Sequence, residues 1–158
     1  MSRQEKINMI AVAYKRLAEF VDAHREAHAQ HGRSLRSVVL FGPLAEDYDY
    51  HEIDILEIVE GWPEGKEGAK LTDEFMRDVN CQLPGRLYPR IVNPKEALFL
   101  AERLHPIIQS VADGYKILFD SENFAKNLMD DVEEKLRIND SLFANKFARS
   151  ATNACSID

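Results

Sequence analysis

The chain has 158 residues, a net charge of −7 and a sequence pI near 5.3. The length is typical of one domain, and a composition of 45% apolar and 30% charged residues excludes a wholly disordered chain. No stretch approaches the roughly 18 consecutive apolar residues of a membrane span, and the N-terminal stretch around Glu5 does not resemble a signal peptide. We therefore expect a single domain over residues 1–158, located in the cytoplasm without membrane association.

Acidic residues are concentrated in the middle of the chain. Residues 46–78 contain 12 acidic and three basic side chains, a local balance of −9, so the remainder of the chain carries +2. Such a segment argues against direct binding to nucleic acid, because phosphate backbones attract clustered Lys and Arg. It is compatible with a bound divalent cation.

The predicted elements begin with a long helix over about residues 3–30. Apolar side chains recur there at spacings of three and four residues, and Ser2 is suited to cap the start. Two short β-branched runs follow, Ser37–Phe41 and Glu52–Val59, whose length favours buried strands. The connection of about ten residues between them is too short for a right-handed crossover. We therefore expect two adjacent antiparallel strands and no doubly wound sheet.

A glycine-rich loop is predicted over residues 60–68, and apolar residues at every fourth position then indicate a second helix that ends before Pro84. A third strand is expected over Leu87–Val92, at an edge of the sheet or with a bulge because it contains Pro89.

Asn93, Pro94 and Glu96 are typical of a helix start. A short strand over Tyr115–Phe119, a last long helix and a frayed tail over about 150–158 complete the prediction. This order predicts an α+β (mixed α/β) fold in which helices cover a small mixed sheet.

Two carboxylates in the second strand are candidate site residues. Side chains alternate along a strand, so Glu52 and Asp54 project from one face, about 7 Å apart. Two such carboxylates can share Mg²⁺ or Mn²⁺, which prefer oxygen ligands and can activate an attacking hydroxyl. Gly42, at the end of the preceding antiparallel strand, should lie near Glu52 and Asp54, and a glycine there allows the backbone to approach a phosphate closely. The alternative is that both acids belong to a solvated face of the sheet.

This arrangement resembles the nucleotidyltransferase superfamily of the DNA polymerase β type, particularly its minimal branch. There a strand is followed by Gly-Ser and a small residue, and Asp-x-Asp lies on the next strand. Here Gly42, Ala45 and Glu52-Ile53-Asp54 stand at those positions. The segments 92–96 and 113–120 also resemble parts of the superfamily, so the likeness covers residues 37–136.

The resemblance implies that Glu52 and Asp54 are catalytic and bind Mg²⁺ or Mn²⁺, and that Gly42 and Pro43 bind a nucleoside triphosphate. The sequence departs from the pattern at four places, the first being Glu52, which is one methylene longer than the usual Asp. Pro43 replaces the serine and has no N–H to donate, Glu46 replaces a basic residue, and Tyr88 falls near the position of a third carboxylate.

Two functions remain open on this basis, and with them whether the chain is an enzyme. The first is metal-dependent nucleotide binding with weak nucleotidyl transfer to a hydroxyl acceptor. The second is a catalytically inactive binding or regulatory module that acts through a partner protein. The resemblance implies a helical partner, as in toxin–antitoxin pairs.

Histidines provide two further candidates. His24, His28 and His31 lie on one face of the first predicted helix, where a His-xxx-His pair can chelate Zn²⁺ or Ni²⁺. The alternative is a solvated helix end that holds three of the five histidines. His51, next to Glu52, is either a general base or an ordinary loop histidine.

Overall fold

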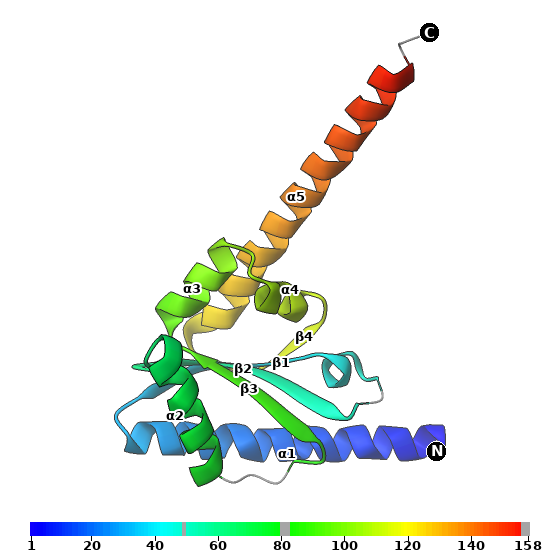
Figure 1. Ribbon diagram of the computed structural model, residues 1–158. Helices are drawn as coiled ribbons and strands as arrows, with labels where there is room; N and C mark the ends of the chain where they lie inside the picture. Colours follow the sequence, from blue (N-terminus) through cyan, green and yellow to red (C-terminus); the bar gives the residue numbers. More distant parts are fainter. Residues whose placement is uncertain (49, 80–82, 156–158) are drawn as a thin grey trace.

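The computed structural model describes residues 1–48, 50–79 and 83–155 (Figure 1). Its helices and strands follow in the order α1 (Arg3–Gln30), β1 (Ser34–Phe41), the 3₁₀ turn η1 (Pro43–Glu46), β2 (Glu52–Glu60), α2 (Gly65–Asp78), β3 (Arg86–Val92), α3 (Pro94–Glu102), α4 (Pro106–Ala112), β4 (Tyr115–Asp120), η2 (Ser121–Asn123) and α5 (Phe124–Cys155). The predicted α+β fold class is confirmed.

The four strands form one mixed sheet in the order β3-β2-β1-β4. Strand β1 is antiparallel to both β2 and β4, as its short connection to β2 predicts, while β2 and β3 are parallel and joined through α2. The strand that contains Pro89 lies at an edge of the sheet, a position where proline is tolerated.

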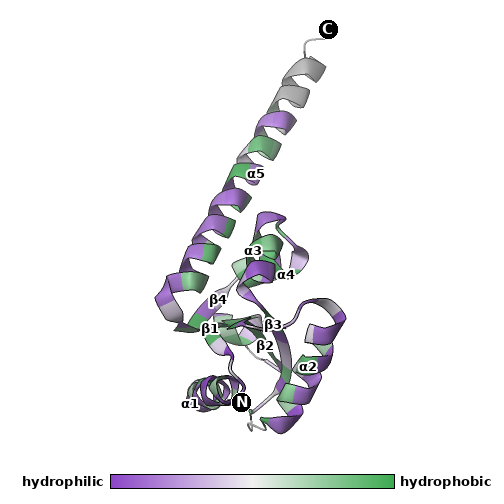
Figure 2. Ribbon diagram, turned by 90° about the vertical axis from the view of Figure 1, so that its left-hand side faces the viewer, coloured by the Kyte–Doolittle hydropathy of each residue, from purple (hydrophilic) through white to green (hydrophobic). Residues whose placement is uncertain are grey.

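Helices cover both faces of the sheet and create two hydrophobic cores. Figures 1 and 2 show α1 and α2 on one side of the sheet and α3, α4 and the start of α5 on the other. Alternation along the strands divides their side chains between the two cores. In β2, Ile53 and Ile55 face α1 and α2, whereas Leu56 and Ile58 face α3, α4 and α5.

Local sequence signals explain where two helices start. Ser2 and Glu5 form a capping box at α1, in which the Ser2 side chain accepts from the Glu5 N–H and the Glu5 carboxylate accepts from the Ser2 N–H. At α3, the Asn93 side chain accepts a hydrogen bond of 2.7 Å from the Glu96 N–H, and Pro94 occupies the first helical position.

Two predicted boundaries differ from the structure. Helix α2 begins at Gly65, inside the predicted loop, because the chain turns back closely on itself: a Cβ at Gly68 would collide with the carbonyl oxygen of Pro63. Helix α5 continues to Cys155, past Ser150 where the frayed tail was expected to begin, while residues 156–158 lie outside the described part of the chain.

Helix α5 extends far beyond the sheet (Figure 1). Its core contacts end with Val132, which is fully buried, and the partly buried Leu136. Farther along, Ile138, Leu142 and Phe143 are exposed, so apolar turns alternate with polar turns on the projecting part (Figure 2). Within the described residues, no helix is both long and apolar enough to cross a membrane.

Candidate functional site

The candidate carboxylates lie at the start of β2, where the strand emerges from the core. Glu52 is exposed and Asp54 is half-buried, and both belong to the face of the sheet that α3, α4 and α5 cover. Asp54 pairs with Phe41 on β1 and with Tyr88 on β3. The structure therefore gives both acids the common face that alternation predicts.

Gly42 lies directly against the Asp54 carboxylate. The glycine has φ +77°, a left-handed conformation that side chains disfavour, and a Cβ there would collide with Asp54 Oδ2. The sequence prediction that Gly42 lies beside an acid of β2 is thus confirmed for Asp54. Pro43 follows as the first residue of η1, so the turn after Gly42 offers one N–H fewer than a serine would.

Asp54 faces a cavity of about 590 Å³ between η1 and α4. Three of its lining residues are acidic (Glu46, Asp54 and Asp113), and none of the lining residues is basic; the others are Phe41, Gly42, Pro43, Tyr48, Ile107, Ser110 and Gly114. The Glu46 carboxylate packs so closely on Gly114 that a Cβ there would collide with it. The site thus gathers negative charge from three separate segments.

Electrostatics at Asp54 follow from this environment. Partial burial raises the pKa of the Asp54 carboxyl above its ordinary value, and the nearby negative charge of Glu52 adds to the rise. A bound cation at Asp54 would therefore relieve an unfavourable charge.

Strand β3 supplies an aromatic and a cationic side chain beside the two acids. Tyr88 pairs with Asp54 in the strand register. It therefore lies near the position where the resemblance leads us to expect a third carboxylate. Arg86 pairs with Glu52, and its guanidinium lies 5.1 Å from the centre of the Tyr88 ring. Sequence reasoning missed this cation beside Glu52, because nothing in the sequence fixed the register of β3 against β2.

His51 does not share the cavity of Asp54. It lines another cavity of about 690 Å³, next to Tyr50 and the N-terminal part of α1. The observed lining gives no support to its role as a general base.

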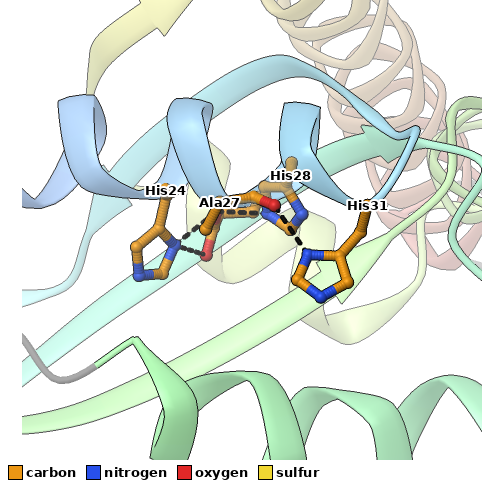
Figure 3. A network of polar contacts seen from close by, with 5 residues as sticks. His24, Ala27, His28 and His31 are labelled. Carbon is orange, nitrogen blue, oxygen red and sulfur yellow. Dashed lines mark hydrogen bonds and ion pairs between the residues drawn. The ribbon is translucent and has the colours of Figure 1, made fainter.

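The fold buries two of the three histidines of the first helix and leaves the third exposed. His31 is exposed and its Nδ1 lies 2.9 Å from the Ala27 carbonyl oxygen, whereas His24 and His28 have no exposed surface (Figure 3). The solvated helix end considered from the sequence is therefore wrong for His24 and His28. Their neighbour is Glu57 of β2, also fully buried, with both carboxylate oxygens 2.8–2.9 Å from His24 Nδ1.

Burial alone would raise the pKa of Glu57, but its contacts with His24 and His28 outweigh burial and hold the pKa below its ordinary value. Among the described residues, His24, His28 and Glu57 form the one group of three histidine, cysteine or acidic side chains close enough to hold a metal ion. Glu52 and Asp54 have no third acid at that distance in the described chain.

Comparison with known proteins agrees with the motif. No protein-family profile matches the chain. It is 26% identical over 105 residues to the "Putative protein adenylyltransferase MJ1305" of Methanocaldococcus jannaschii, which covers 65% of this chain and 70% of that protein.

Similar solved structures include a toxin–antitoxin with AMP-PNP (15% identity, TM-score 0.40, 76% of this chain and 86% of that chain). Another is a tri-AMPylated Shewanella oneidensis HEPN toxin in complex with MNT antitoxin (16% identity, TM-score 0.39, 76% and 83%). The strand–Gly42–strand arrangement and the similarity to the archaeal protein agree with the predicted resemblance to nucleotidyltransferases of the DNA polymerase β type.

Proposed function

We propose that this protein binds a nucleoside triphosphate as its Mg²⁺ or Mn²⁺ complex at Glu52 and Asp54, and transfers the nucleoside monophosphate slowly to a hydroxyl acceptor. The observation that carries the proposal is the contact between the Asp54 carboxylate and Gly42 at the wall of the acidic cavity. It brings a metal-binding oxygen against a glycine, the residue type whose backbone a phosphate can approach most closely.

The charge of the cavity supports a requirement for metal. Its lining contains Glu46, Asp54 and Asp113 and no basic side chain, so a free triphosphate would be repelled. Carboxylate oxygens are the donors that Mg²⁺ and Mn²⁺ prefer. Partial burial and the negative charge of Glu52 raise the pKa of the Asp54 carboxyl, and a bound cation would offset that negative charge. The residues therefore fit a hard divalent cation.

Each residue of the proposed site would have a separate role. Glu52 and Asp54 hold the cation, which when bound activates the acceptor hydroxyl and stabilises the leaving pyrophosphate. Gly42 lets the triphosphate approach the backbone. Arg86, placed beside Glu52 by the register of β3, is available to a phosphate oxygen.

Three residues limit the rate. Pro43 offers no N–H, Glu46 places a negative charge in the phosphate cavity, and Tyr88 occupies the position where a third carboxylate is expected. Loss of one positioned transition-state contact typically costs about 3–4 kcal/mol, or two to three orders of magnitude in rate. Binding is therefore expected to be much easier to detect than turnover.

The test is calorimetric titration of the protein with ATP, with and without Mg²⁺ or Mn²⁺. The archaeal relative's name makes ATP the first nucleotide to use and a protein hydroxyl the first acceptor. We expect binding that requires the metal and is weakened at least tenfold by Asp54→Asn, a loss of about 1.4 kcal/mol. Asp131→Asn, an exposed acid on α5, is the matched control and should bind like the wild type. Equal affinity in Asp54→Asn and wild type would contradict the proposed site.

A regulatory module without catalysis is the second candidate. It is favoured by Tyr88 beside Asp54 and by the exposed apolar side chains Ile138, Leu142 and Phe143 on α5, which suit a protein partner. Incubation with labelled ATP, metal and acceptor proteins separates the two candidates. Transfer that Asp54→Ala abolishes supports the enzyme, whereas metal-dependent binding without any transfer supports the module.

A further inference from the structure

A second cluster of chemistry-bearing side chains lies on the other face of the sheet from Asp54. His24 and His28 occupy successive turns of α1, and Glu57 reaches them from β2. All three are fully buried, and one ligand atom from each lies within 4.8 Å of the others. Figure 3 shows the His24 and His28 rings side by side beneath α1, with His31 turned to the Ala27 carbonyl.

Aromatic side chains enclose this cluster. Phe20 packs on the His24 ring at 3.7 Å, and Phe75 stacks on the His28 ring at 4.2 Å, both measured between ring centres. Trp62 meets His28 edge to face at 5.5 Å, and the Arg33 guanidinium lies 4.9 Å from the Trp62 ring. The polar atoms of the cluster therefore have few hydrogen-bonding groups within reach.

Unpartnered polar atoms gather here. Seven buried side-chain nitrogen and oxygen atoms have no hydrogen-bond partner among the described residues. Three of them belong to the two histidines (His24 Nε2, His28 Nδ1 and His28 Nε2), and two belong to side chains that surround the cluster (Arg33 Nε and Trp62 Nε1). Buried polar groups are normally hydrogen-bonded, since each unpaired one costs free energy. Both ring nitrogens of His28 are unpaired, so the side chain is buried with its full hydrogen-bonding capacity unused.

Protonation gives only some of the polar atoms of the cluster a partner. One proton on His24 Nδ1 would neutralise Glu57 across the 2.8 Å contact. It would leave His28 as it is, because His28 Nε2 lies 3.5 Å from Glu57 Oε1, beyond an ordinary N–H···O hydrogen bond. A centre that accepts a lone pair from both imidazoles and from the carboxylate would use all three side chains.

We propose that His24, His28 and Glu57 bind one divalent transition-metal ion of the Zn²⁺ class. Two histidines four residues apart on a helix and a carboxylate from another element form a donor set that suits Zn²⁺, with a fourth position left for water. Tetrahedral coordination at about 2.0–2.2 Å places ligand atoms roughly 3.4 Å apart. The observed separations, from 2.8 Å to less than 4.8 Å, bracket that value.

This site is independent of the proposed nucleotide site. Imidazole nitrogens favour Zn²⁺ and other divalent transition-metal ions over Mg²⁺, which prefers oxygen ligands. Glu57 and Asp54 are three residues apart on β2 and therefore face opposite sides of the sheet. Because the ion would join α1 to β2 inside a core, its role is structural, and metal binding stabilises the folded state.

The experiment is refolding of the metal-free wild-type protein with and without Zn²⁺, since fully buried ligands are reached most readily while the chain folds. We expect one equivalent to bind and to raise the Tm by about 5–10 °C at a hundredfold excess of free Zn²⁺ over its Kd. Co²⁺ provides a second readout, because Trp62 is the chain's single tryptophan and its ring contacts His28. Co²⁺ in the site should quench the Trp62 fluorescence with one-to-one stoichiometry.

Three variants locate the ion. His28→Gln should abolish both the Tm rise and the quenching. His31→Gln, which changes an exposed imidazole on the same helix, should keep both, and so should Asp54→Asn, which alters the nucleotide site alone. Failure of the refolded wild type to bind one equivalent would overturn the proposal and leave a proton-bridged triad. Loss of the response in His31→Gln, or an unchanged response in a folded His28→Gln, would equally overturn it.

Discussion

The contact between Gly42 and Asp54 determines what other residues either position can accept. Gly42 adopts φ +77°, and the space on its Cβ side is filled by the Asp54 carboxylate. A side chain at this position would be strained by the backbone and would also displace the acid. The short β1–η1 connection therefore positions Asp54 as well as turning the chain.

Gly42→Ala tests this double role against Gly32→Ala. Gly32 has a similar φ of +70° but open space on its Cβ side. Gly32→Ala should lower the free energy of unfolding by about 1–2 kcal/mol, because alanine is strained at positive φ, and Gly42→Ala should lower it by more, because its Cβ also collides with the Asp54 carboxylate. Only Gly42→Ala should also weaken binding of the metal–ATP complex, by at least tenfold, since only there is Asp54 displaced. Denaturant unfolding and calorimetry measure the two effects, and equal nucleotide affinity in both variants would contradict the argument.

The raised pKa of Asp54 predicts a dependence of stability on pH. The folded protein binds the Asp54 proton more tightly than the unfolded chain does, so this contribution to stability is fully present below the ordinary pKa of 3.8 and is lost as pH rises through the folded-state pKa. In metal-free buffer at pH 7, Asp54→Asn should therefore have a higher Tm than the wild type.

The difference should shrink as the pH falls toward 3.8, where the wild-type carboxyl is protonated as well. Thermal melts from neutral pH down to about pH 4 measure it. A Tm for Asp54→Asn that is lower than wild type at pH 7 would show that the charged acid is stabilised by contacts in the fold.

The buried face of helix α1 includes two histidines as well as apolar residues. Leu17, Val21, His24 and His28 follow at spacings of four, three and four residues, and all four are buried. The periodicity that predicts the buried face thus extends through the two histidines. The same periodicity includes His31, three residues after His28, so it does not separate the three histidines; His31 is exposed because α1 ends at Gln30.

The projecting part of α5 adds little to the stability of the domain. The described side chains from Asp140 to Lys146 are all exposed, and Figure 1 shows this part of the helix away from the sheet. We expect a protein that ends at Asn139 to unfold within about 2 °C of the full chain, since core contacts end near Leu136. Thermal melts compare the two proteins. A large fall in Tm would show that this part of α5 packs on the domain.

At the scale of the whole molecule, the sheet separates two sets of ionisable groups. The acids of the cavity beside Asp54 lie on the face covered by α4, and the His24–His28–Glu57 group lies on the face covered by α1 and α2. Both sets include residues of β2. A single strand thus contributes to two separate groups of ionisable side chains, because its side chains alternate between two cores.

The sequence by itself determined the elements, the fold class and the common face of Glu52 and Asp54, since these follow from local periodicity, caps and short connections. It also predicted Gly42 beside Asp54 and the edge position of Pro89. The helical start at Gly65 was missed, because it depends on packing of Gly68 against Pro63.

Only the tertiary structure decided which ionisable groups meet. Glu57 joins His24 across 33 residues, and Glu46 and Asp113 join Asp54 from separate segments. Such contacts depend on helix orientation and strand register, which are fixed by burial of side chains throughout the chain. No local pattern carries that information, because the partners of a buried polar group are chosen by the packing of the entire core.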